Sequence, residues 1–369
     1  MKIFFLANAA SIHTIRWVNT LADREHEVHL LFNFDDNPKD NQISSKVIQH
    51  RLKYSGTKAY YINAFGLKQL FKKIKPDIVN AHYASGYGTL ARLAKVSPLI
   101  LSVWGSDVYD FPYQSKLRMK IIKKNLLYAT KIASTSHCMA NQVNRLLGSI
   151  KVDIGVTPFG VDTEIFSRRE KYKSKEKIYI GNIKALSPNY GITDLIKAIK
   201  ILKGNLEKNG LADISNNIGV CIYGDGIQKD EIVSLIDQLK LNDTVELKGR
   251  IPNSEIPMAL EKMNIFCVAS DSESFGVAAV EAMAMELPVV ATDADGFKEV
   301  VEDGVTGIIV ERKNEQALAN ALTKLVLDPM LCELMGKAGR KRVLKMYDWK
   351  DNVGVMEGLY KEVIQCYTN

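Results

Sequence analysis

Short apolar runs alternate with stretches of helical period along this chain, and the alternation runs through the sequence twice. In the first half, the runs that we interpret as strands are Ile3–Leu6, Glu27–Phe32, Ile78–Ala81, Leu99–Val103 and Lys131–Ser134. Between them lie amphipathic stretches such as Ile12–Arg24 and Ser115–Ala129. Strands that alternate with helices of about 10–15 residues indicate βαβ units around a parallel sheet.

The pattern restarts after residue 176 and predicts a second open α/β unit. Its expected strands are Lys177–Gly181, Gly219–Tyr223, Val245–Lys248, Ile265–Val268, Pro288–Ala291 and Gly307–Val310. Its expected helices are Gly191–Lys203, Lys229–Leu239, Ile256–Lys262 and Gly276–Met285. Between the two units, the charged segment 167–176 has the composition of a solvated linker. We therefore predict one domain over residues 1–166 and a second over residues 177–349.

The composition is that of a globular protein of the cytoplasm. No run approaches the roughly 18 apolar residues that would span a bilayer. The apolar start meets Asn8, His13 and Arg16 at once, so we interpret it as a buried strand and not as a signal peptide. The five cysteines are scattered and lack CxxC spacing, which favours a reducing compartment over a disulfide frame or a zinc site.

Charge is divided unevenly between the two halves. Residues 1–173 hold 26 Lys and Arg against 13 Asp and Glu, a net of +13, and residues 174–369 hold 23 against 29, a net of −6, which sum to the formal charge of +7. A basic half favours a polyanionic partner. The basic segment 115–131 is compatible with an anionic membrane surface, on the inner face of the cell membrane, and equally with an ordinary solvated helix face. No nucleic-acid-binding module is present, so we expect no nucleic-acid partner.

The strongest candidate site follows the expected strand Ile265–Val268. A loop of small and acidic residues leads there to Gly276, where the next helix begins. The unpaired N–H groups of a helix N-terminus suit a phosphate, and glycine lets a ligand approach the backbone closely. Glu281 lies in an otherwise apolar helix, where a carboxylate could accept from vicinal hydroxyls, and Glu273 in the loop could reach a sugar. The alternative is that both are ordinary surface acids.

The segment ESFGVAAVE over 273–281, followed by AMAMELPVVAT, resembles the E-x7-E signature of the retaining glycosyltransferases of the family-four group. Further matches follow in that family's order: TPFGVDTEIF at 157–166, YGDG at 223–226, KGRI at 248–251, DGVTG at 303–307 and YDW at 347–349. The resemblance implies the GT-B architecture, with two Rossmann-like doubly wound domains facing a central cleft. It also implies that the last helix, 350–369, joins the first, acceptor-side domain.

The resemblance assigns roles to residues of the second, donor-binding domain. It implies that Glu273 contacts the donor sugar and that Glu281 holds the ribose hydroxyls. Other expected donor-binding residues lie in the same loop and in three further motifs. These are Ser274, Phe275, Gly276, Val277, Arg250, Ile251, Gly224 and Gly160.

The sequence departs from the family where the diphosphate is neutralised. Many members carry an Arg and a Lys in a G-R-L-x-x-x-K-G segment, whereas this chain has GNIKALSPNYG over 181–191. Lys184 is the one cation in that stretch, and we expect it to take over the leaving-group role. The alternative is that Lys184 ends a strand and points to solvent.

The first domain supplies candidates for the catalytic and acceptor side. His13 and Arg16 begin the first expected helix, after a loop in which the family's two glycines are replaced. Trp104 stands where many members have a histidine, which removes a titratable group. Asp107 could act on the acceptor or merely cap a helix. His82, after the strand Ile78–Ala81, is a further candidate.

The implied reaction moves a hexose or N-acetylhexosamine from a nucleoside-diphosphate sugar, with UDP the commonest nucleotide, to a glycan or polyprenyl-diphosphate-linked glycan of a surface polysaccharide. We expect retention of configuration, no cofactor and no metal, because a helix N-terminus and Lys184 would stabilise the leaving charge. The Asp293-x-Asp295 motif has the form of a metal-binding D-x-D, but we interpret it as part of a loop that lines the donor pocket. The sequence also leaves open a sugar-nucleotide epimerase of the same fold, an enzyme similar to glycogen synthase, and an inactive sugar-nucleotide-binding subunit.

Overall fold

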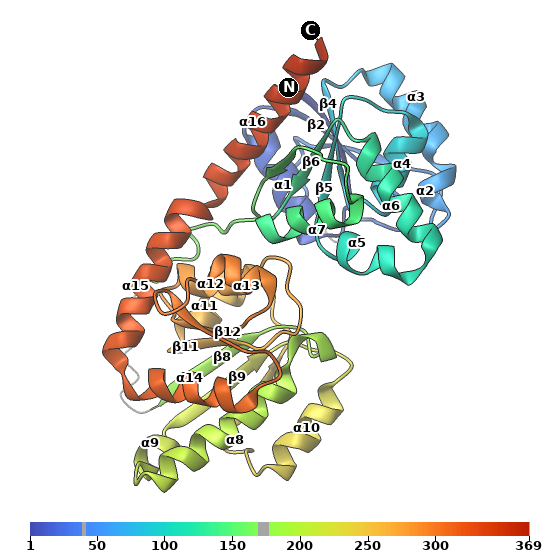
Figure 1. Cartoon of the computed structure of the whole chain (residues 1–369). Helices are drawn as coiled ribbons and strands as arrows, with labels where there is room; N and C mark the ends of the chain where they lie inside the picture. Colours follow the sequence, from blue (N-terminus) through green and yellow to red (C-terminus); the bar gives the residue numbers. More distant parts are fainter. Residues whose placement is uncertain (39–41, 169–176, 369) are drawn as a thin grey trace. The chain divides into compact units, whose positions relative to one another are not determined.

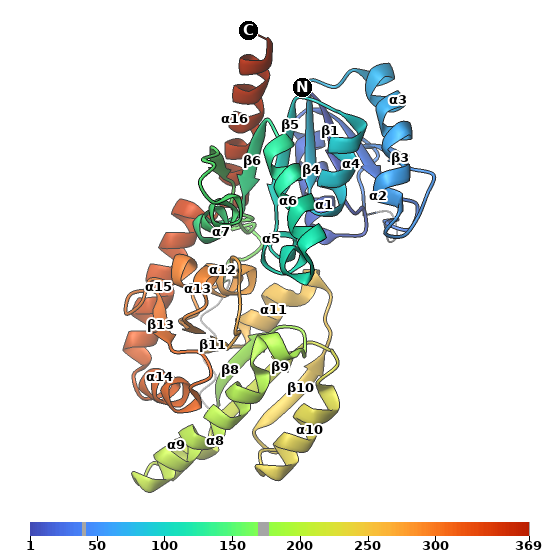
Figure 2. The ribbon, with the colours of Figure 1, turned by 45° about the vertical axis from the view of Figure 1, so that its right-hand side comes forward.

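The computed structural model of this chain describes residues 1–38, 42–168 and 177–368, and these form two compact units. The first unit combines Met1–Pro158 with Lys350–Asn369, and the second is Phe159–Trp349. Each unit has its own parallel sheet between layers of helices (Figures 1 and 2). The predicted pair of doubly wound α/β domains is therefore confirmed.

The sheet of the first unit has seven parallel strands in the order β3-β2-β1-β4-β5-β6-β7. They are β1 (Lys2–Leu6), β2 (Glu27–Phe32), β3 (Ile48–Arg51), β4 (Ile78–His82), β5 (Leu99–Val103), β6 (Lys131–Ser134) and β7 (Ile154–Val156). The direction of winding reverses between β1 and β4. Ligands of open α/β sheets bind outside the carboxyl ends of the strands at such a reversal. The loops after β1 and β4 are therefore the part of this unit best placed to bind a ligand.

Helices cover both faces of this sheet because neighbouring residues of a strand point to opposite sides. Val79 and Ala81 of β4 join the core beneath α3, α4, α6 and α7. Asn80 and His82 point to the opposite face, where Tyr360 of α16 reaches Asn80. The helices are α1 (Ile12–Asp23), α2 (Ala59–Ile62), α3 (Ala64–Ile74), α4 (Gly86–Ala94), α5 (Ser106–Tyr109), η1 (Phe111–Gln114), α6 (Lys116–Tyr128), α7 (His137–Leu147) and α16 (Trp349–Thr368).

Helix α16 belongs to the first unit although it ends the chain. The Tyr360 hydroxyl is fully buried and donates to Asn80 Oδ1 at 2.8 Å. Glu357 accepts from Arg24 at 2.9 Å and pairs with His26 at 2.8 Å. The expectation that the last helix joins the first domain agrees with these contacts.

The sheet of the second unit has six parallel strands in the order β10-β9-β8-β11-β12-β13. They are β8 (Ile178–Ile183), β9 (Ile218–Tyr223), β10 (Val245–Gly249), β11 (Ile265–Val268), β12 (Val289–Thr292) and β13 (Gly307–Val310). The winding reverses between β8 and β11, so the loops after these two strands occupy the ligand-binding position of the unit. The helices are η2 (Pro188–Tyr190), α8 (Ile192–Lys208), α9 (Ala212–Asn216), α10 (Lys229–Gln238), η3 (Asn253–Glu255), α11 (Ile256–Glu261), α12 (Val277–Ala284), α13 (Asp295–Val300), α14 (Glu315–Leu327) and α15 (Pro329–Met346).

The boundary between the units lies earlier than the predicted residue 166. The segment after Pro158 packs with the second unit, where Val161 N–H donates to Tyr347 O at 2.8 Å and Trp349 N–H donates to Val161 O at 2.9 Å. Most of the predicted linker, residues 169–176, lies outside the described residues. Among the described residues, no helix is both long and apolar enough to cross a membrane.

We expect Tyr360→Phe to lower the free energy of unfolding by about 1 kcal/mol, because it removes one buried hydrogen bond that ties α16 to the sheet. Chemical denaturation of the full chain measures the loss. Tyr367, which is 55% exposed on the same helix, supplies the control, since Tyr367→Phe should leave stability unchanged. Equal stability of Tyr360→Phe and the native protein would contradict the anchoring role.

Candidate functional site

Lys184 and Glu273 meet at the winding reversal of the second sheet. Lys184 directly follows β8, and Glu273 lies in the loop between β11 and α12. The Lys184 Nζ atom is 2.6 Å from Glu273 Oε2, and both side chains are 14% exposed. The ammonium also lies 4.9 Å from the centre of the Tyr190 ring. Lys184 therefore does not point to solvent but pairs with the glutamate of the loop before α12.

The loop that carries Glu273 is shaped by close backbone packing. Gly276, the residue before α12, has a φ of +104°, and a Cβ there would lie 2.9 Å from the Phe297 ring. Gly296 N–H donates to Glu273 O at 2.9 Å, and a Cβ on Gly296 would lie 2.5 Å from Phe275 N. Side chains are thus excluded from both positions, which lets the chain turn sharply from Glu273 into the N-terminus of α12.

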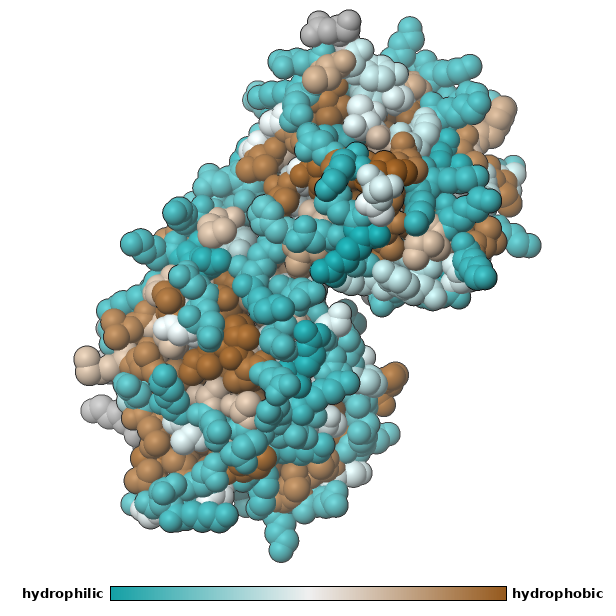
Figure 3. Space-filling view, in the orientation of Figure 1, coloured by the Kyte–Doolittle hydropathy of each residue, from teal (hydrophilic) through white to brown (hydrophobic). Residues whose placement is uncertain are grey.

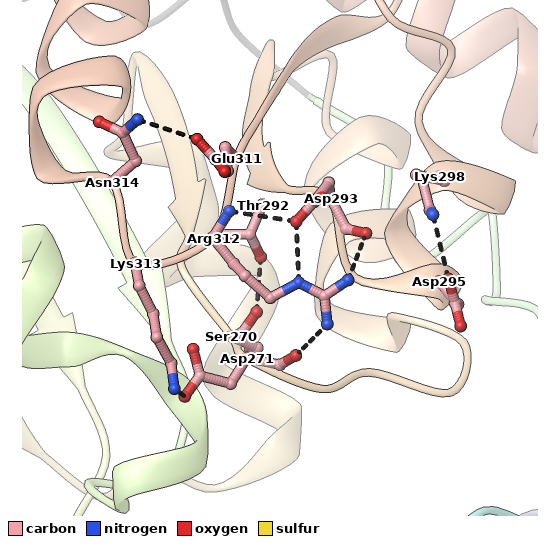
Figure 4. Close-up of polar contacts among 10 residues, drawn as sticks. All are labelled: Ser270, Asp271, Thr292, Asp293, Asp295, Lys298, Glu311, Arg312, Lys313 and Asn314. Atoms are coloured by element: carbon pink, nitrogen blue, oxygen red, sulfur yellow. Dashed lines mark hydrogen bonds and ion pairs between the residues drawn. The ribbon is translucent and has the colours of Figure 1, made fainter.

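Arg312, just beyond β13, binds the same loop to its neighbours (Figure 4). Its guanidinium donates to Asp271 O at 2.8 Å, to Asp293 Oδ1 at 2.9 Å and to Asp293 O at 3.1 Å. Lys313 pairs with the Asp271 carboxylate at 3.3 Å. Because Asp271 is two residues from Glu273, this network fixes the start of the loop that presents the glutamate.

The two aspartates of the Asp293-x-Asp295 motif are each paired with a cation. Asp293 accepts from Arg312, which holds the pKa of its carboxyl below the usual value against the opposing effect of burial. Asp295 pairs with Lys298 at 3.0 Å. The residues that the structure describes include no cluster of three or more His, Cys, Asp or Glu arranged to hold a metal ion. The local geometry gives this motif a structural role in the loop after β12.

The other predicted donor residues lie in this loop, in α12 or in segments that follow a strand. Glu281 lies one turn into α12 on a half-buried face, beside the buried Val280 and Ala282. The remaining residues are near the loop or follow β9, β10 and β7. In and beside the loop, Ser274 and Val277 are half-buried, and Phe275 and Gly276 are buried. After β10, Arg250 is exposed and Ile251 is half-buried. Gly224 follows β9 and packs against Lys184 O, and Gly160 is buried with a φ of +62°.

In the first unit, His82 belongs to a buried polar chain at the carboxyl end of β4. The Asn80 amide donates to Ile100 O at 3.2 Å and to Ser102 Oγ at 2.9 Å, so its Oδ1 must be the acceptor for Tyr360 and for His82 Nε2 at 2.9 Å. His82 is therefore protonated on Nε2. Its Nδ1 is buried and has no hydrogen-bond partner among the described residues. Burial, with a smaller contribution from His13, lowers the pKa of His82 to about 3.

Trp104 lies against both His13, predicted as catalytic, and His82, predicted for the acceptor side. Its ring centre is 4.8 Å from that of His82 and 5.6 Å from that of His13. Burial, and then Arg16 on the same helix, lowers the pKa of His13 to about 4, so both imidazoles are neutral near pH 7. The structure thus brings His13, Arg16, His82 and Trp104 to the winding reversal of the first sheet.

The carboxylate of Asp107 binds backbone N–H groups of two loops. Its buried carboxylate accepts from the backbone N–H groups of Ala84, Gly105 and Trp104 at 2.8, 2.9 and 3.1 Å. Burial raises the pKa of Asp107, and these three hydrogen bonds oppose the shift. Of the two interpretations left open by the sequence, the geometry favours the structural one, because the carboxylate joins the loops after β4 and β5.

Both units match known protein families. Residues 164–342 match the family described as "Glycosyl transferases group 1", and residues 2–136 match the family described as "Glycosyl transferase 4-like". The chain belongs to the family-four glycosyltransferases. The chain has the two-domain GT-B fold of that family.

Similar glycosyltransferases are known from archaea and bacteria. One, from Methanocaldococcus jannaschii, is 28% identical over 96% of this chain and 94% of its own length. The capsular polysaccharide biosynthesis glycosyltransferase CapM of Staphylococcus aureus is 27% identical over 80% of this chain and 79% of its own length.

Solved structures share the fold over nearly the whole chain. Sucrose-phosphate synthase from Thermosynechococcus elongatus has a TM-score of 0.83 at 18% identity and covers 99% of both chains. HepE from Anabaena, solved in complex with UDP, has a TM-score of 0.81 at 18% identity and covers 98% of this chain and all of its own. At these identities the structural likeness establishes the fold alone.

Arg312 fixes the loop that presents Glu273, so Arg312→Met should let that glutamate shift. A shift of about 1 Å costs up to about 100-fold in rate, and we expect kcat/KM for the sugar donor of this glycosyltransferase to fall by about 10- to 100-fold. Arg312→Lys should recover only part of the loss, since an ammonium cannot reach Asp271 and Asp293 together.

Arg342 supplies the matched control for Arg312. It likewise donates to two backbone carbonyls, those of Val300 and Glu299, but these lie at the C-terminal end of α13 and not in the Glu273 loop. Arg342→Met should cost comparable stability and leave the KM for donor unchanged. Identical kinetic effects of the two variants would show that Arg312 acts only through stability.

The neutral His82 should make stability fall in acid. Its folded pKa of about 3 lies below the ordinary value of 6.5, so the stabilisation is complete above pH 6.5 and is lost as the pH falls toward the folded value, by at most about 1.4 kcal/mol per pH unit. Melting temperatures measured between pH 7 and 4 should therefore fall less steeply for His82→Gln than for the native chain. Parallel curves would contradict the buried neutral imidazole.

Proposed function

We propose that this glycosyltransferase transfers a hexose or N-acetylhexosamine, with retention, from a nucleoside-diphosphate sugar to a glycan or lipid-linked glycan acceptor. The observation that carries the proposal is the Lys184–Glu273 pair at the winding reversal of the second sheet, beside the N-terminus of α12. The cation and the helix terminus offer two sources of positive potential to a leaving diphosphate. The carboxylates of Glu273 and Glu281 offer hydrogen-bond acceptors for sugar hydroxyls.

Each residue has a separate role in the proposed transfer. As the bond between the sugar and the diphosphate breaks, negative charge grows on the phosphate oxygens. The Lys184 ammonium and the N–H groups at the start of α12 stabilise that charge without a metal. Glu273 orients the sugar, and Glu281, one turn along the same helix, binds the ribose. The leaving phosphate oxygen takes the proton of the acceptor hydroxyl, so no strongly basic side chain is needed.

UDP is the proposed nucleotide, and a surface polysaccharide is the proposed destination. The support for UDP is the complex reported for HepE, which shares the fold. The support for a polysaccharide is the name of CapM, which places that relative in capsular polysaccharide biosynthesis. A thermal-shift series with UDP- and GDP-sugars tests the nucleotide, since a ligand at about 100 times its Kd adds about 2.7 kcal/mol of stability. NMR of the anomeric proton in the product tests retention, and activity in EDTA tests the absence of a metal.

Lys184→Met should lower kcat by about 100- to 1000-fold, the usual effect of removing one group that stabilises developing charge. Binding of the donor should weaken less, because stabilisation is greatest in the transition state. Lys298→Met is the matched control: it also breaks a lysine–carboxylate pair of this unit, but one that is about half exposed and worth about 0–1 kcal/mol.

Unimpaired transfer by Lys184→Met would remove the lysine from the mechanism. Binding of UDP-sugars without transfer to any glycan acceptor would favour an inactive binding subunit. Conversion of the donor sugar without an acceptor would favour an epimerase.

A further inference from the structure

One stretch of the first unit contains many cations and no acid. Residues 41–76 include eight Lys and Arg and not a single Asp or Glu. The stretch contains α2 and α3, and Asp77 is the first acidic residue after it. This stretch therefore accounts for eight of the thirteen net positive charges of the basic half. It is distinct from the basic segment 115–131 that the sequence pattern singles out.

Helices α2 and α3 have two apolar faces, and only the inner face packs against the core of the unit. On the inner face Ala59 and Leu67 are buried, and Leu70, Phe71 and Ile74 pack against the core. On the outer face Tyr61, Ile62 and Phe65 are 50%, 49% and 70% exposed. Three or four residues separate neighbours along a helix face, so the exposed Lys58, Tyr61, Ile62, Phe65, Lys68 and Lys72 form one outer stripe.

Buried hydrogen bonds and ring packing beneath the outer stripe form its base and fix its position. Asn63, between α2 and α3, is buried; its amide donates to Asn33 Oδ1 and to Tyr54 O, both at 3.0 Å, and its Oδ1 accepts from Tyr54 N at 3.1 Å. Tyr60 packs on Tyr87 of α4, with ring centres 5.2 Å apart. The outward position of Tyr61, Ile62 and Phe65 is therefore set by the fold.

Aromatic rings and cations also meet in the segments bonded to this base. The Arg51 guanidinium lies 3.5 Å from the centre of the Phe34 ring, and Lys53 lies 5.5 Å from that of Tyr54. Phe34 and Tyr54 are 46% and 42% exposed. Along the right-hand edge of Figure 3, where Figure 1 places α2 and α3, brown and teal atoms are interspersed. The surface thus offers apolar and cationic groups together, with the exposed Asp35 beside its Phe34 end.

We propose that the stripe Lys58–Lys72 of α2 and α3 docks on an anionic lipid surface. Lipid headgroups supply the negative charge for the lysines, and the boundary below them accepts the Tyr61 ring and the Ile62 and Phe65 side chains. A nucleic acid would match the charge but would leave the apolar side chains without a partner. The docking does not depend on the proposed transfer reaction.

Helix α6 is the weaker candidate for the same partner. Its apolar stripe is turned inward, since Ile122 and Leu126 are buried in the core. Its exposed apolar residues, Leu117 and Leu127, are ten positions apart and stand singly among lysines. The α6 face therefore resembles a solvated basic helix, whereas the α2–α3 stripe has three adjacent exposed apolar side chains.

Vesicle flotation with the full-length chain tests the proposal. The chain should float with vesicles of phosphatidylcholine and phosphatidylglycerol at 7:3, but not with phosphatidylcholine alone. Phe65→Ser with Ile62→Ser, and separately Lys68→Glu with Lys72→Glu, should each reduce the partition coefficient at least about 10-fold, since each surface lysine contributes several-fold to binding on anionic lipid. Binding by the native chain should weaken in 0.5 M salt.

Matched variants control for charge, apolarity and location. Lys200→Glu with Lys208→Glu on α8 makes the same charge change, and Met330→Ser with Leu334→Ser on α15 removes similarly exposed apolar side chains. All four double variants should keep the native melting temperature and the native shift with UDP-sugar. The two control variants should float like the native chain.

Several results would overturn the docking surface. The chain could float without anionic lipid, or either α2–α3 variant could float like the native chain. Lys120→Glu with Lys124→Glu on α6 could abolish flotation while the α2–α3 variants keep it. The chain could also bind single-stranded DNA selectively in place of vesicles. Because flotation needs neither donor nor transfer, a failed docking test would leave the proposed reaction untouched.

Discussion

The parallel order of the two sheets determines where this glycosyltransferase can carry chemistry. Every strand in each sheet runs the same way, so all carboxyl ends lie along one edge. At β1 and β4, and again at β8 and β11, the chain winds away in opposite directions and the loops separate. His82 and Lys184 directly end or follow strands at these points, and Glu273 lies in the loop after β11. The proximity of Lys184 and Glu273 is a consequence of the order of the strands.

Buried ionisable side chains are accommodated differently at the two winding reversals. Lys184 and Glu273 neutralise each other, which makes a half-buried cation tolerable. His82 and His13 instead stay uncharged, because removal from water disfavours the imidazolium. The winding reversal of the second unit therefore holds an ion pair. Among the described residues, that of the first unit holds two neutral imidazoles, the Arg16 guanidinium and the buried, unpartnered Nδ1 of His82.

The strands could be located from the sequence because parallel strands are buried on both faces and appear as short apolar runs. Ile265–Val268 and Gly307–Val310 match the structure at both ends, whereas the edge strand β3, IQHR, has no apolar run to reveal it. Local spacing also identified Glu273 and Lys184, but not that they touch, since 89 positions separate them. Arg312 and Asn80 were missed because most of their partners, such as Asp271 and Tyr360, are distant in the sequence. A polar residue inside the apolar run of β4 was the one available signal for Asn80.

The chain enters the second unit near Val161 and leaves it at Trp349, and these two segments are hydrogen-bonded to each other. The second unit is therefore one continuous piece of chain inserted into a discontinuous first unit. A ribosome that has made residue 349 has completed everything the second sheet needs. The first unit still lacks α16 at that moment, so Asn80 does not yet have its Tyr360 donor and Arg24 does not yet have its Glu357 acceptor. The unit that begins at the N-terminus is thus the last to be completed, the reverse of the usual order in a protein of two domains.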